Sequence, residues 1–150
     1  MKQIRHNTFE TNSSSSHSIT ISNKGHFDSN ALPVVKYYNG TRNCVVLTGE
    51  HFGWEVDEFT DAQTKANYLA TFVDTVEMYQ QDMSKLKKQL IDCIKEVTGC
   101  ESVVFDTDGA DAYIDHQSEE VALAAFKDKD TLKHFIFNRG SVLRTDNDNH

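Results

Sequence analysis

The chain has 150 residues, one proline, 38% hydrophobic residues and a formal net charge of −8. This composition indicates one folded domain over residues 1–150 with a short acidic tail at 146–150, and excludes a largely disordered chain. The acidic charge disfavours direct contact with nucleic-acid phosphates, and no stretch reaches the roughly 18 apolar residues of a membrane span.

The cysteines and the charged start of the chain indicate a reducing compartment. Cys44, Cys93 and Cys100 are odd in number and lack a Cys-x-x-Cys spacing, so we expect neither structural zinc nor a disulfide. Residues 1–6 carry charges with no apolar region after them, which is unlike a signal peptide. We expect no metal and no cofactor.

Strands are predicted over the first third of the chain. A first strand is expected at 2–9, a second at Ile19–Ile21, and a pair at 34–38 and 44–47. Asn39-Gly40 between the last two predicts a hairpin, whose loop extends as far as residue 43 if the intervening polar residues are not paired.

Two helices are predicted in the middle of the chain. Thr60 to Gln63 resembles a capping box, and apolar residues then recur every three or four positions as far as Val97, before Gly99. Typical helix lengths favour a break near residues 80–82 over one long helix. Four residues of the apolar stripes are expected in the core: Leu69, Val73, Leu90 and Ile94.

The last third predicts short elements of both kinds. Strands at 102–105 and 112–115 are expected to form a hairpin around an aspartate-rich turn, since the spacing does not match a calcium loop. Short helices follow at 119–126 and 131–137, the second capped by Asp130, and a strand closes the chain at 141–145. The predicted class is α+β, with one mixed or antiparallel sheet and the two long helices on one face.

The most distinctive stretch is the polar run from Phe9 to Ser18. Four serines can offer hydroxyl and amide groups to an anion, although serine runs are also typical of flexible linkers. Apolar residues at both ends favour an ordered segment held by hydrogen bonds. The candidate ligand-binding residues are Glu10, Asn12, Ser13, Ser14, Ser15, Ser16 and Ser18, together with Asp115.

Two histidines lie beside predicted strands within polar motifs. His17 and His116 could share acid and base roles at a phosphate ester if their strands are neighbours. Residues 116–118 match the His-x-Ser pattern of two-histidine phosphoesterases, whereas 17–19 do not. The alternative is that both rings make structural hydrogen bonds or face solvent.

Residues 50–60 alternate aromatic and acidic side chains. One interpretation is a loop pinned to the core by its aromatic rings. The other is an acidic, aromatic surface for a partner, made of Phe52, Trp54, Glu55 and Glu58.

The run Phe9-Glu10-Thr11-Asn12-Ser13-Ser14-Ser15-Ser16-His17-Ser18 near the start resembles a family of small proteins encoded by large bacteriophages. The same resemblance includes His51-Phe52-Gly53-Trp54, residues 64–70, residues 113–118 and Thr145-Asp146-Asn147-Asp148. It implies a viral protein in the host cytoplasm, and it transfers no activity and no catalytic residue.

Two functions of different classes follow from these patterns. The first is a binding protein that acts on a host or virion protein. The second is a small nucleotide- or phosphate-binding enzyme built from residues 13–17 and His116. The sequence indicates no oligomeric state.

Overall fold

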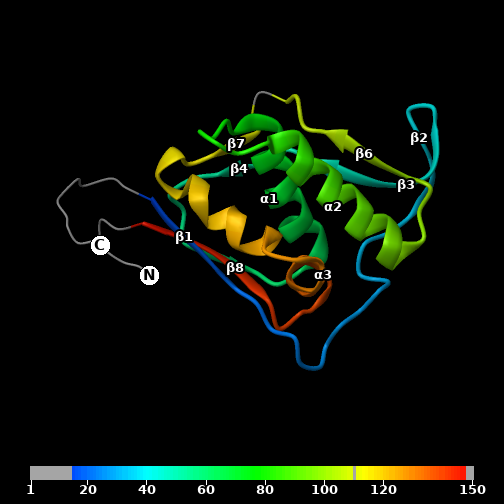
Figure 1. Cartoon of the computed structure of the whole chain (residues 1–150), viewed down its shortest axis with the longest axis horizontal. Helices are drawn as coiled ribbons and strands as arrows, with labels where there is room; N and C mark the ends of the chain where they lie inside the picture. The colour runs from blue at the N-terminus through cyan, green and yellow to red at the C-terminus, as the bar shows by residue number, and fades with distance from the viewer. Residues whose placement is uncertain (1–14, 110, 148–150) are drawn as a thin grey trace.

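The computed structural model describes residues 15–109 and 111–147, and at residues 15, 16, 116, 117 and 147 it describes the backbone alone. The fold is α+β, as predicted, and Figure 1 shows its elements. In chain order they are β1 (Ser15–Thr20), β2 (Val35–Tyr38), β3 (Thr41–Thr48), β4 (His51–Phe52), β5 (Asp57–Phe59), α1 (Ala62–Thr75), α2 (Met83–Thr98), β6 (Ser102–Asp106), β7 (Tyr113–Ile114), the 3-10 helix η1 (His116–Phe126), α3 (Lys129–Phe137) and β8 (Val142–Asn147).

The described strands fall into three hydrogen-bonded groups, where the sequence predicted one sheet. The orders are β1-β8-β5, which is antiparallel, β2-β3-β6, which is mixed, and β4-β7, which is parallel. Helix α1 packs against β3 and α2 packs against β6, so the two long helices cover the mixed sheet as expected. Figure 1 shows β1 and β8 on the other side of these helices.

The hairpin between β2 and β3 is confirmed, with a loop of two residues. Asn39 and Gly40 both have positive φ, 46° and 88°, as in the tight turns that match strand twist. Tyr38 pairs with Thr41 directly after the turn. The longer loop is therefore wrong, because residues 41–43 belong to β3.

The hairpin expected between β6 and β7 is also wrong. β6 pairs in parallel with β3, and β7 pairs in parallel with β4. The chain reaches β6 only after the crossover through α1 and α2, and a crossover of this kind brings strands together in parallel.

The helical region is broken as predicted, between Thr75 and Met83. Gln80 has a φ of 65°, which no α-helix can include, and the Asp82 side chain caps α2 by accepting from the Ser84 and Lys85 amides. The N-caps that the sequence predicted at Thr60 and Asp130 are wrong by one and two residues. Asp61, not Thr60, accepts from the Thr64 amide, and Asp128, not Asp130, caps α3.

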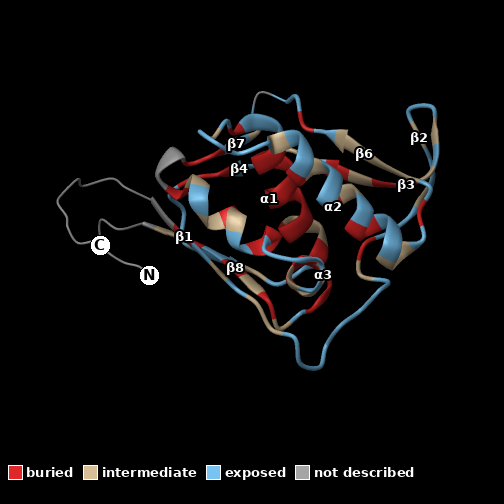
Figure 2. Ribbon diagram, in the orientation of Figure 1, coloured by how far each residue is buried: buried red, intermediate tan, exposed pale blue. Residues whose placement is uncertain are grey.

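Helix α1 lies at the centre of the molecule and is buried along most of its length (Figure 2). The four predicted core residues, Leu69, Val73, Leu90 and Ile94, are confirmed, each at most 6% exposed.

Four side chains of α1 that carry polar groups are buried with the apolar ones: Lys65, Asn67, Tyr68 and Thr71. Lys65 Nζ donates to the Asn138 and Ser141 carbonyls at 2.8 and 2.9 Å, and burial lowers its pKa to about 8, against the opposing effect of Asp61. The Asn67 amide bonds residues 48 and 50. Tyr68 contacts the candidate site.

Both outer boundaries of the fold differ from the predicted strands. β1 begins at Ser15, within the serine run, and β8 continues to Asn147, into the predicted tail. Ser16 pairs with Asp146 in this ladder, so backbone pairing extends each strand through residues whose side chains favour turns. The first strand expected at 2–9 lies outside the described residues.

Candidate functional site

The serine run is only partly within the described structure. Ser15 to Ser18 form most of β1 and pair with β8. Since the His17 amide donates away from β8, the alternation of an antiparallel ladder leaves the amides of Ser16 and Ser18 for β8, and not for an anion. Glu10, Asn12, Ser13 and Ser14 lie outside the described residues.

His17 is a buried residue at the centre of the site, with 5% of its surface exposed. Its Nε2 lies 2.9 Å from the Gly53 carbonyl and its Nδ1 lies 3.0 Å from the Tyr68 hydroxyl. Because a carbonyl only accepts, Nε2 carries the proton and Nδ1 accepts from Tyr68. These structural hydrogen bonds are the alternative to catalysis at His17, and they use both ring nitrogens.

The environment keeps the His17 ring neutral. Burial lowers its pKa, and the hydrogen bond to Gly53 and the charge of Asp115 oppose this effect without cancelling it. Tyr68 is fully buried and its pKa is raised, chiefly by burial, so its hydroxyl remains a donor.

This depressed pKa predicts a pH effect on stability. Below an unfolded pKa of about 6.5, the unfolded chain binds a proton at His17 that the folded chain excludes. As the pH falls from about 6.5 to the lowered pKa of His17 in the folded protein, the free energy of unfolding of the wild type should therefore fall toward that of His17→Gln. The fall is at most about 1.4 kcal/mol per pH unit.

Urea titrations of both proteins between about pH 7.5 and pH 5 measure this difference, since linear extrapolation of each transition to zero urea gives the free energy of unfolding. A wild-type advantage that stays constant or grows as the pH falls would contradict the neutral, buried ring.

The two polar motifs singled out in the sequence meet in space. The His17 amide donates to Ser118 Oγ at 3.1 Å, which covers the outer edge of β1 with η1. Asp115 lies at the start of the same motif and is 6% exposed. His17, Ser118 and Asp115 are thus neighbours, while the side chain of His116 is not described.

A parallel strand pair next to His17 sorts its side chains into two faces. His51 pairs with Tyr113 and Phe52 pairs with Ile114. Phe52 and Ile114 are 3% and 2% exposed and point into the core, whereas the rings of His51 and Tyr113 stack on the outer face with centroids 5.0 Å apart. This alternation follows from the period of two in a strand.

Trp54 stands beside this stacked pair and is fixed by Asp115. The indole Nε1 donates to Asp115 Oδ1 at 2.9 Å, and the Tyr113 hydroxyl lies 3.4 Å from the same oxygen. Trp54 and Tyr113 remain 47% and 41% exposed. Both aromatic side chains therefore contact one buried carboxylate and still present a surface to solvent.

These residues surround an open groove of about 470 Å³, next to β4 and β7. We call it the aromatic groove, and it is lined by His51, Gly53, Trp54, Glu55, Tyr113 and Asp115. A β-carbon on Gly53 would lie 2.8 Å from His51 Cε1, so glycine at this position lets the imidazole lie over the backbone.

The four residues of the predicted partner surface therefore do not form one surface. Trp54 and Glu55 line the aromatic groove. Phe52 must be corrected, because its buried ring packs on Tyr68 with centroids 4.8 Å apart and no partner can reach it. Glu58 is exposed on β5, where its carboxylate pairs with Arg144 at 2.9 Å.

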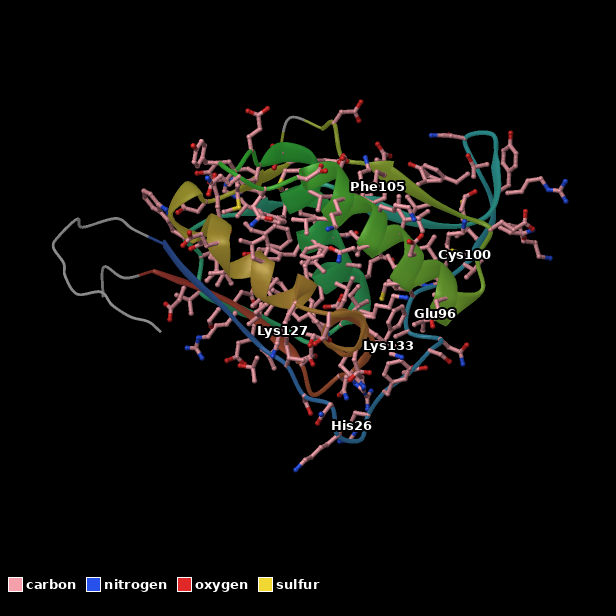
Figure 3. The ribbon with its side chains drawn as sticks, viewed as in Figure 1. His26, Glu96, Cys100, Phe105, Lys127 and Lys133 are labelled. Atoms are coloured by element: carbon pink, nitrogen blue, oxygen red, sulfur yellow. The ribbon has the colours of Figure 1, made fainter. Side chains whose placement is uncertain are left out.

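A second hollow of about 250 Å³ lies between α2 and α3. Glu96 and Lys133 are both at its rim (Figure 3), and its other lining residues also carry charges of both signs, so charge selects no ligand there.

Among the described side chains, no group of three His, Cys, Asp or Glu residues is arranged to hold a metal ion. No helix in the described ranges is long and apolar enough to cross a membrane.

No protein-family model matches the chain, and neither a curated protein nor a solved structure matches it significantly.

His51, Tyr113 and Tyr68 also belong to this region and were not predicted from the sequence. The signal for the first two was present, because His51-Phe52 and Tyr113-Ile114 each place a polar aromatic residue before an apolar one at a strand position. Nothing in the sequence indicated that these two short strands pair, or that the Tyr68 hydroxyl would contact His17.

Proposed function

We propose that the protein is a binding protein, and that it recognises a protein partner through the aromatic groove. The observation that carries this proposal is the exposure of Trp54 and Tyr113 around the buried carboxylate of Asp115. Aromatic side chains with one polar atom anchored and one face exposed are the residues that contribute most to protein interfaces.

The alternative, a small nucleotide- or phosphate-binding enzyme, finds less support. It requires His17 to exchange protons with a ligand, but both nitrogens of this ring already bond Tyr68 and Gly53. The carboxylates of the aromatic groove would also repel phosphate.

The resemblance to bacteriophage proteins suggests the identity of the partner. Its motifs include residues 51–54 and 113–118, which are also the segments that form the aromatic groove. We therefore propose a host or virion protein as partner, met in the host cytoplasm.

Site-specific photo-crosslinking tests this proposal. A benzophenone amino acid replaces Val56, which is 64% exposed and two residues beyond Trp54, or Tyr37, which is 68% exposed on the distant strand β2 (Figure 1). In host cells we expect a discrete cross-linked protein from position 56 alone, and its loss when Trp54→Ala is added. Equal products from both positions, or products that persist in Trp54→Ala, would refute a role for the groove.

A further inference from the structure

The aromatic groove combines flat aromatic surfaces with negative charge. Its six lining residues include three rings and two carboxylates, Glu55 at the rim and Asp115 at the floor, and none of them is a lysine or arginine. A cation over an aromatic face within about 6 Å is attracted by the ring quadrupole, and the carboxylates add to this attraction. The groove is therefore built for a cation and against an anion.

We infer that the aromatic groove binds an arginine side chain, presented by a basic segment of the protein partner. This inference rests on the proposed function and names the chemistry that the groove recognises. Arginine fits better than lysine because its planar guanidinium stacks on a ring face while its edge donates to a carboxylate. The groove offers both partners side by side, since the exposed carboxylate of Glu55 follows the exposed Trp54 indole in the chain and both line the groove.

The walls of the groove are fixed before any partner arrives. Trp54 is held by its hydrogen bond to Asp115, His51 by stacking on Tyr113, and the Gly53 carbonyl by His17. A site whose side chains are already ordered loses less conformational entropy on binding.

The surroundings favour a basic segment over an isolated arginine. The strand next to Glu55 begins with Asp57 and Glu58, both exposed, and the chain as a whole has a net charge of −8. Arg144 pairs with Glu58 and neutralises part of this charge, and the exposed carboxylates of Glu55 and Asp57 add further negative charge at this edge. Nucleic acid would also offer bases for stacking, but its phosphates would meet this acidic edge.

Trp54 is the only tryptophan in the chain, so its fluorescence reports on the groove directly. The full-length protein is titrated with a tetra-arginine peptide amide, with the tetralysine peptide, and with tetracitrulline, which keeps the shape of arginine without its charge. We expect a saturable change of Trp54 emission with arginine, binding about 3-fold weaker with lysine, and binding at least about 10-fold weaker with citrulline.

A pair of variants with the same charge change locates the site. Glu55→Gln removes one carboxylate from the groove and should weaken arginine binding by about 3- to 10-fold. Glu96→Gln removes one from the rim of the hollow between α2 and α3 (Figure 3) and should leave the affinity unchanged.

Several results would overturn the inference: equal binding of the citrulline peptide, equal weakening by both variants, or tighter binding of a single-stranded oligonucleotide at Trp54. An unchanged Trp54 emission with every peptide at millimolar concentration would overturn it as well. If the cross-link from position 56 still depends on Trp54 in that case, the proposed function stands without the arginine. If the cross-link is absent too, both fall.

Discussion

Leu90→Ala is expected to lower the free energy of unfolding by about 2–5 kcal/mol. Leu90 is fully buried in the large core cluster of the described residues, and its helix α2 packs against α1, α3 and β6. Removing its isobutyl group forfeits the transfer free energy of the lost atoms and leaves a cavity that the surrounding helices and strand can fill only in part.

The neighbouring residue provides the matched control. Ile91 follows Leu90 on the same helix but is partly exposed, so Ile91→Ala should cost clearly less than Leu90→Ala. Urea titrations of both variants, followed by Trp54 fluorescence, measure the two losses at one pH. Equal losses would mean that the apolar stripe of α2 is placed wrongly.

Tyr68→Ala is expected to cost about 3–5 kcal/mol, in the range of other buried aromatic truncations. The Tyr68 side chain is fully buried, its ring packs edge-on against Phe52, and its hydroxyl bonds His17 Nδ1. The truncation therefore removes core volume and a hydrogen bond together, directly beneath the aromatic groove.

Tyr68→Phe separates these two effects. It keeps the ring and removes only the hydroxyl, which leaves Nδ1 of His17 without this donor, at a cost of about 1–3 kcal/mol. The indole N–H resonance of Trp54 gives a second readout, and we expect it to shift more in Tyr68→Ala. A phenylalanine variant as unstable as the alanine variant would mean that the hydroxyl, and not the packing, dominates at this position.

The burial of polar side chains on α1 could not be predicted from the sequence. The apolar stripe of this helix was readable, since Leu69 and Val73 recur at helical spacing. Lys65 and Asn67 lie outside this apolar pattern, yet both are buried. Each is buried because it bonds loops that are distant in sequence, and the periodicity of a single helix carries no information about such contacts.

In the candidate site, too, the sequence indicated residues and only the structure showed their contacts. The sequence singled out His17, Trp54, Glu55, Asp115 and Ser118 from composition and position. In the structure, His17 is buried because its ring bonds the Gly53 carbonyl. Trp54 lines the groove because its indole N–H bonds the Asp115 carboxylate.

By itself, the sequence determined the class of this protein, its hairpin at Asn39-Gly40, the break between its two long helices and its apolar core. These features depend on residues close together in the chain, where turn chemistry and periodicity act directly. Only the tertiary structure decided how the strands pair and which polar residues are buried. Pairing of β4 with β7 joins segments about sixty residues apart, and such contacts are selected by the packing of the whole chain rather than by any local preference. The aromatic groove exists because of that pairing.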